Sequence, residues 1–122
     1  MKGGERTLLG RWGEAQVADW LRSRGYRVID ANWRCRFGEV DLISVYEKYI
    51  CFTEVKLRKN ADFAQAREFV DRRKQEKVRT AASLYLSTKP TSLQPRFDVA
   101  EVYAPEGTDT KQPEIHYIEN AF

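Results

Sequence analysis

Three charged side chains in residues 38–58, GEVDLISVYEKYICFTEVKLR, have types and spacing that suit a site for a divalent cation. The segment alternates as two strands joined by a two-residue turn, a register that places Asp41 opposite Glu54. Lys56 follows Glu54 by two residues and projects from the same face. Directly opposed Cβ atoms lie about 4.5–5.5 Å apart, so two carboxylates there repel unless they share a proton or bind a cation.

The chemistry available to this set is metal-assisted hydrolysis. Carboxylate oxygens suit Mg²⁺ or Mn²⁺, and an ammonium group beside such an ion stabilises charge that develops on a phosphate. The alternative is a solvated strand face on which Lys56 neutralises acids across the ladder, including Glu39, which this register places opposite Lys56. Ile43 and Phe52 share the face of the acids, which favours a packed face over a wet one.

The elements that must position these residues follow from hydrophobic periodicity. Apolar spacing predicts helices over residues 8–24 and about 64–87; alternation predicts strands over 26–31, 39–46, 49–57, 96–103 and 114–119, with a polar connector over 32–38. The order is helix, three strands, helix, two strands. It predicts a single α/β domain over residues 1–122, with a mixed central β-sheet flanked by α-helices.

Glu14 lies on the apolar stripe of the first predicted helix, in series with Val17, Ala18 and Leu21. A carboxylate on a core-facing stripe is unexpected, because burying an unpaired charge is costly. Either this end of the stripe reaches solvent, which periodicity alone favours, or a partner such as a cation lies there.

Composition narrows the class of protein. The chain has 122 residues, 42% hydrophobic and 32% charged, which is typical of a soluble globular protein. It contains no run of about 18 apolar residues and no secretory signal, so we expect a cytoplasmic protein without a membrane partner. Cys35, Cys51 and His116 are too few for a structural zinc site, and free thiols are the simplest interpretation.

Basic residues gather in short clusters although the net charge is only +3. Such clusters could neutralise the phosphates of DNA, and ordinary solvated helix faces explain them equally well. The candidates for contact with the nucleic-acid backbone are Arg34, Arg36, Arg58, Arg72, Arg73, Lys74 and Lys77.

Together, Glu14, the GEVD of residues 38–41 and the EVK of residues 54–56 resemble the PD-(D/E)xK nuclease superfamily. The chain is most similar to the small bacterial YraN-like family. GRWGEAQVADWLRSRGYRVIDANWRCRFGEVDLI and CFTEVKLR resemble the central signature of that family, and RRKQEKVRTAASLYL, RFDVAEVY and IHYIENAF resemble its later segments. The resemblance covers nearly the whole chain and extends to archaeal Holliday-junction resolvases, which carry a glutamate on a helix before the Asp and Glu-x-Lys elements.

The resemblance implies a restriction-endonuclease-like core and assigns roles by position. Asp41 and Glu54 would be metal ligands, and the backbone carbonyl of Val55 would be a further ligand. Lys56 would position or activate the attacking water. Glu14 would complete the metal shell, directly or through water.

Other positions fit the resemblance less closely. Val40 occupies the place of a proline that is variable across the superfamily. Glu39 could form a structural salt bridge, which we expect, or bind a second metal. Gln75 could approach the site from the second helix, and we assign Asp98 to a structural contact.

The expected function is metal-dependent hydrolysis of DNA phosphodiester bonds in repair, recombination or uptake. A chain of 122 residues leaves no room for a separate recognition domain, which favours branched, flap or single-stranded DNA over a specific duplex sequence. Whether the chain acts alone or as a homodimer stays open. The alternative is a non-catalytic nucleic-acid-binding module, or a partner-recruiting domain, on the same fold.

Overall fold

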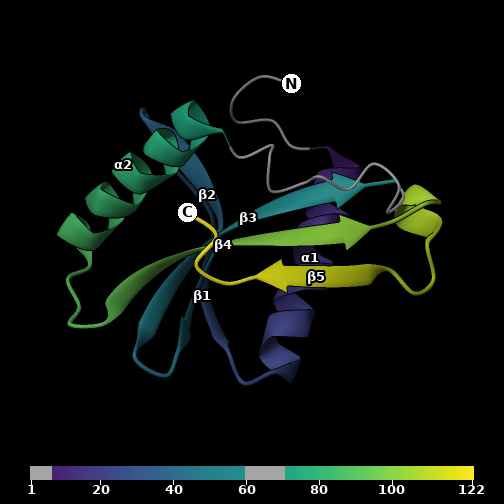
Figure 1. Ribbon diagram of the computed structural model, residues 1–122, viewed down its shortest axis with the longest axis horizontal. Coiled ribbons are helices and arrows are strands. Elements are labelled where there is room, and N and C mark those ends of the chain that lie inside the picture. Colours follow the sequence, from purple (N-terminus) through teal and green to yellow (C-terminus); the bar gives the residue numbers. More distant parts are fainter. Residues whose placement is uncertain (1–6, 60–70) are drawn as a thin grey trace.

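The computed structural model describes residues 7–59 and 71–122, in which two α-helices flank one mixed β-sheet (Figure 1). The elements are α1 (Leu8–Ser23), β1 (Arg27–Cys35), β2 (Gly38–Tyr46), β3 (Tyr49–Arg58), α2 (Arg72–Thr88), β4 (Gln94–Tyr103), the 3₁₀ turn η3 (Gly107–Asp109) and β5 (Glu114–Ile118). The predicted order and the predicted fold class are confirmed. Residues 64–70 of the second predicted helix lie outside the described residues.

The strands lie in the order β1-β2-β3-β4-β5, and only the β3–β4 pair is parallel. Parallel neighbours need a crossover, and α2 lies in the connection between these two strands. The predicted hairpin register is confirmed where Val45 pairs with Ile50 and Ile43 with Phe52. None of the described helices is long and apolar enough to cross a membrane.

Strand β1 is longer than its sequence pattern indicates, because it continues through the predicted connector to Cys35, which pairs with Gly38. Two backbone irregularities in β1 obscure the alternation of polar and apolar residues that would predict a strand. The register shifts between Val28 and Asp30, and Asn32 takes a left-handed φ of 54°. On an edge strand such bulges redirect side chains, so polar and apolar residues no longer alternate simply.

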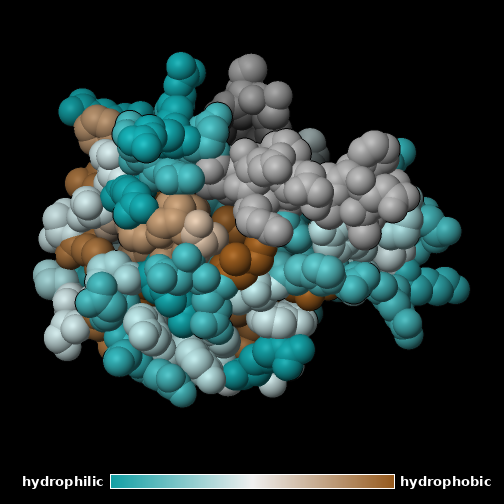
Figure 2. Space-filling model, viewed as in Figure 1, coloured by the Kyte–Doolittle hydropathy of each residue, from teal (hydrophilic) through white to brown (hydrophobic). Residues whose placement is uncertain are grey.

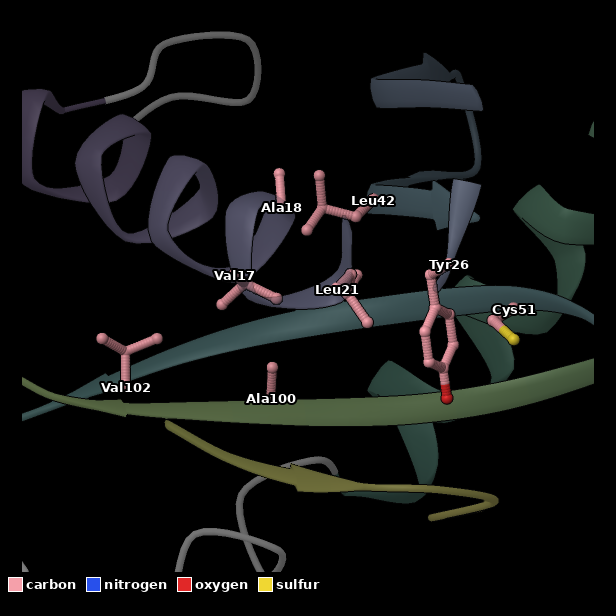
Figure 3. Packing of buried hydrophobic residues seen from close by; sticks show 8 residues of the cluster. All are labelled: Val17, Ala18, Leu21, Tyr26, Leu42, Cys51, Ala100 and Val102. Atoms are coloured by element: carbon pink, nitrogen blue, oxygen red, sulfur yellow. The ribbon is translucent and has the colours of Figure 1, made fainter. Parts of the chain in front are cut away.

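The two helices pack on opposite faces of the sheet, as neighbouring strand residues show. Leu42 lies in the core cluster with Val17 and Leu21 of α1, whereas Ile43 lies in the cluster with residues of α2. Figure 3 shows Val17 and Leu21 of α1 directed toward β4, where Ala100 and Val102 lie. Cys51 belongs to this α1 cluster; both cysteines are free thiols.

The sheet forks between β2 and β3. Their ladder ends at the Leu42–Thr53 pair, beyond which β2 stays paired with β1 as far as Gly38, and β3 stays paired with β4 as far as Arg58. Figure 1 shows these two arms running to different sides of the molecule. The predicted direct pairings of Asp41 with Glu54 and of Glu39 with Lys56 therefore do not form, because each strand follows its other neighbour as the sheet twists.

Candidate metal centre

Asp41 is the first residue of β2 beyond the fork, and its buried carboxylate reaches across to β3. Its Oδ2 accepts a hydrogen bond from the backbone N–H of Val55 at 2.8 Å. A buried backbone donor that loses its ladder partner needs another acceptor, and the Asp41 carboxylate supplies it. The acid is thereby held next to Glu54.

Glu54 is the first residue of β3 beyond the fork, and it is only 3% exposed. Its Oε1 lies 3.1 Å from the Nζ of Lys74 on α2. Its Oε2 is buried and has no hydrogen-bond partner among the described residues. A buried carboxylate oxygen without a partner is costly, and it is available to a cation.

The two carboxylates repel each other when both are ionised. Burial raises the pKa of Asp41 well above its usual value, and the negative charge of Glu54 raises it further. Burial also raises the pKa of Glu54, against the opposing effect of the Lys74 ammonium. Two buried acids whose ionised forms are both disfavoured are stabilised by a bound cation.

Replacing Asp41 by Asn should raise the melting temperature of the metal-free protein at neutral pH. The raised pKa means that protonated Asp41 contributes stability that is fully present below its usual pKa of 3.8 and is lost as the pH rises through the folded value. The amide of the variant stays neutral throughout. The advantage of Asp41→Asn should therefore be small near pH 4 and reach several degrees at pH 7, since one pKa unit is worth about 1.4 kcal/mol. Melting curves in EDTA across this range test it, and a pH-independent difference would contradict it.

Lys56 lies within electrostatic range of both acids. It is half-buried on β3, and burial lowers its pKa together with the positive charge of Lys74, whereas Glu54 and Asp41 act in the opposite direction. The structure thus brings Asp41, Glu54 and Lys56 together at the fork.

Glu14 and Glu39 surround this set from two elements. Glu14 is half-buried on α1, and its charge contributes to the raised pKa of Asp41. Glu39 also raises the pKa of Asp41, but its ion-pair partner is Arg34 on β1, with Nε 3.6 Å from Oε1, rather than the predicted Lys56. β2 pairs Glu39 with Arg34 in its ladder with β1, which explains the exchange of partner.

The residues at the fork fit Mg²⁺ or Mn²⁺. Mg²⁺ is commonly bound by one or two carboxylates and completes its octahedron with waters and substrate phosphate. Asp41 and Glu54 supply two carboxylates, one with an unpartnered oxygen. Over residues 7–59 and 71–122, no three Asp, Glu, His or Cys side chains converge as a ready-made metal site, so Glu14 stands near the pair without completing it.

Lys74 is the main difference from the predicted arrangement. The sequence predicts that Lys74 contacts DNA, whereas in the structure its ammonium pairs with Glu54. Burial lowers the pKa of Lys74 and the charge of Glu54 raises it, and the net shift is upward. No local pattern could reveal this pairing, because it joins β3 to the first turn of α2.

The other basic candidates are distributed over β1, the β1–β2 turn, β3 and α2. Arg34, Arg36 and Lys77 line a hollow of about 420 Å³. Arg73 and Lys77 line a neighbouring hollow of about 300 Å³. Arg72 is exposed at the start of α2, Arg58 is half-buried on β3 beyond Lys56, and Gln75 is half-buried next to Lys74. Figure 2 shows hydrophilic residues over α2, with hydrophobic ones between them.

Comparison with known proteins places most of the chain in one family. The model of "Uncharacterised protein family UPF0102" matches residues 13–102, a span that contains every residue of the fork. A UPF0102 protein from Acetivibrio thermocellus is 42% identical over 120 residues, covering 96% of this chain and 92% of its own. Another from Caldanaerobacter subterraneus is 38% identical over 124 residues and covers 100% of both chains. One from Alkaliphilus metalliredigens is 38% identical over 115 residues, covering 93% of this chain and 96% of its own.

Proposed function

The chain belongs to the uncharacterised protein family UPF0102, the YraN family, and from the forked sheet we propose that it is a metal-dependent endonuclease that hydrolyses DNA phosphodiester bonds. One observation carries the proposal: two buried, mutually repelling carboxylates meet at the fork, with the Lys56 ammonium within range and one oxygen of Glu54 unpartnered. Structural acids on a solvated face would need neither burial nor convergence.

Asp41 and Glu54 would hold Mg²⁺ or Mn²⁺, with the backbone carbonyl of Val55 as a further ligand and Glu14 acting directly or through water. The bound ion would supply positive charge that activates a water and neutralises the scissile phosphate. The protein's own part is to fix both carboxylates: the Val55 N–H holds Asp41, and the β3–β4 ladder holds Glu54 opposite Val99.

Lys56 would act on the phosphate and the water. Its ammonium would stabilise the negative charge that develops on the phosphate oxygens as water attacks phosphorus and the leaving oxygen departs with the bond electrons. Burial lowers its pKa, which makes the amine easier to deprotonate than an exposed lysine and suits it to orient the water as well. Both roles need an amine on the same side of β3 as Glu54.

Lys74 would serve as the counter-ion of Glu54 until a bound metal ion displaces it. A divalent cation on Glu54 would repel the ammonium 3.1 Å from its Oε1. The displaced Lys74 would then be available to a phosphate, which agrees with its predicted role in backbone contact. Arg34, Arg36, Arg58, Arg72, Arg73 and Lys77 would extend that contact without reading sequence.

The substrate class would be branched, flap or single-stranded DNA in the cytoplasm, with one catalytic site in each chain. A homodimer would supply the second site that cleavage of both strands of a duplex needs. We expect the purified chain to cleave labelled flap, four-way and single-stranded substrates with Mn²⁺ or Mg²⁺, and none of them in EDTA. No cleavage of any substrate with either ion would contradict the proposal.

A non-catalytic nucleic-acid-binding module is the second candidate. It is favoured by the Lys74–Glu54 ion pair, which already neutralises one acid, and by the lack of a ready-made three-ligand group in the described part of the chain. Steeply salt-dependent DNA binding without turnover on every substrate would support this candidate over the nuclease.

A further inference from the structure

Phe37 is an aromatic side chain exposed at the tip of the β1–β2 hairpin. It is 44% exposed, and the guanidinium carbon of Arg36 lies 4.9 Å from its ring centroid. Single exposed apolar residues are normal on protein surfaces, so exposure alone carries no function. The surroundings of this ring set it apart.

Two hollows meet at Phe37. The first, of about 420 Å³, is also lined by Arg34, Arg36 and Lys77, and the second, of about 300 Å³, shares Phe37 and Lys77 and adds Arg73. The acids in these linings are Glu39 and Glu76, and Glu39 is already engaged by Arg34 at 3.6 Å. An aromatic face between hollows with an excess of cationic side chains is complementary to a nucleotide, which combines a flat base with an anionic phosphate.

The backbone next to Phe37 packs closely on α2. A Cβ added at Gly38 would lie 3.2 Å from the backbone carbonyl oxygen of Lys77 and 3.3 Å from its Cβ. Only glycine lets the two backbones approach this closely without a shift. The hairpin backbone that carries Phe37 is therefore held close to α2 at Lys77.

The hollows adjoin the carboxylate fork. Glu39 lines the first hollow and lies on β2, two residues before Asp41. On α2, Lys74 contacts Glu54, and Lys77 lies three residues further along the helix, a rise of about 4.5 Å. Phe37 precedes Asp41 by four residues, about 13 Å along an extended chain, so a single strand with a phosphate at the fork can extend to the Phe37 ring.

We propose that Phe37 is a stacking platform for an unpaired base of single-stranded DNA, and that Arg36, Arg73 and Lys77 bind the flanking phosphates. This inference rests on the proposed function and names its substrate class. Bases inside a duplex keep both faces in the stack, so away from the duplex ends only an unpaired nucleotide can offer its face to the ring. Phe37 would then confer the preference for single-stranded arms of branched substrates.

Binding in EDTA tests the inference without any cleavage. Fluorescence anisotropy would compare a labelled single-stranded oligodeoxynucleotide, a blunt duplex of the same length and an RNA of the same sequence. We expect Phe37→Ala to weaken single-strand binding about 5- to 150-fold, the usual range for one lost base stack, and to leave duplex binding within about twofold. Phe37→Trp should retain affinity, whereas Phe37→Leu should lose it as Phe37→Ala does.

Leu84→Ala serves as the matched control, because Leu84 is a 37% exposed apolar residue of α2 that lines neither hollow. Any of these results would overturn the inference: equal loss on single strand and duplex, no loss, full affinity of Phe37→Leu, binding confined to RNA, or no single-strand binding by the wild type. The two proposals fail separately. If binding depends on Phe37 but the wild type cleaves nothing, only the proposed nuclease activity is contradicted. If the wild type cleaves DNA but binding does not depend on Phe37, only the stacking role of Phe37 is contradicted.

Discussion

Asp41→Asn and Glu54→Gln should each lower Mn²⁺-dependent phosphodiester hydrolysis by at least about 10²–10³-fold, the scale for losing one group that stabilises developing charge. Each substitution removes one of the two anionic side chains that meet at the fork. The neutral amide is a weak ligand for a hard cation, so the site would lose both affinity and charge balance.

The fold should survive both changes. The amide oxygen introduced by Asp41→Asn can still accept the Val55 N–H, and both amides relieve the repulsion between buried carboxylates. Glu54→Gln removes the counter-ion of Lys74, but that lysine side chain is 40% exposed and can turn to water. Lost activity with an unchanged or raised melting temperature is therefore the signature of a site rather than of a structural contact.

Gel-based cleavage assays with the flap and single-stranded substrates would measure the loss. Asp30→Asn is the matched control, since Asp30 is a half-buried carboxylate of β1 whose ion-pair partner is Lys89, 3.3 Å away. As an independent readout, saturating Mn²⁺ should raise the melting temperature of the wild type and of Asp30→Asn but not that of the two site variants. Wild-type cleavage rates in Asp41→Asn and Glu54→Gln would end the catalytic assignment.

The hairpin shows why the site could be anticipated in part. Apolar alternation and the place of the turn fix the register from Val45–Ile50 to Ile43–Phe52, and this register puts Asp41 and Glu54 at the same level. The fork itself has no signature in these residues, because it depends on how β2 follows β1 and how β3 follows β4. Asp41 and Glu54 therefore lie next to each other across the fork, and they do not form a pair in the β2–β3 ladder.

Long-range contacts were beyond the reach of local patterns. The Lys74–Glu54 ion pair and the exchange of Glu39 from Lys56 to Arg34 depend on packing between elements that are separate in the sequence. The sequence predicts a helix over residues 8–24, and α1 ends one residue earlier, at Ser23. Gly25 was the signal for this end, and it takes the left-handed φ of 92° that ends a helix. Strong local signals, in short, were sufficient for the elements and insufficient for their side-chain partners.

Asp98 lies on β4 at the centre of a buried hydrogen-bond network. From the sequence, only a structural contact is expected of this residue. It is 0% exposed and accepts hydrogen bonds from the Arg96 Nε at 3.0 Å, the Tyr117 hydroxyl at 2.6 Å and the backbone N–H of Asn120 at 2.9 Å. The Arg96 Nη2 donates to Asp98 at 3.0 Å and to the Tyr26 hydroxyl at 2.8 Å. The carboxylate thus neutralises the guanidinium of Arg96, a residue that is only 6% exposed.

Asp98→Ala should lower the free energy of unfolding by about 3–5 kcal/mol, the cost of leaving a buried charge without its partner. After the substitution, Arg96 would keep the Tyr26 hydroxyl, and Glu119, at 3.7 Å from Nη1, is 60% exposed and too solvated to compensate. Domains of this size unfold with about 5–15 kcal/mol, so the loss is a large fraction of the total. Urea unfolding followed by circular dichroism would measure it.

A double variant separates the network from a simple cavity. If the penalty comes from the unpaired guanidinium, Arg96→Met combined with Asp98→Ala should be less destabilised than the sum of the two single variants, because the second change removes the charge that the first exposes. Additive losses, or a loss below about 1 kcal/mol for Asp98→Ala, would contradict this account. Asp41→Asn and Glu54→Gln should lose cleavage activity but keep their stability. Asp98→Ala should instead lose stability, and its remaining folded fraction should cleave DNA at the rate of the wild type.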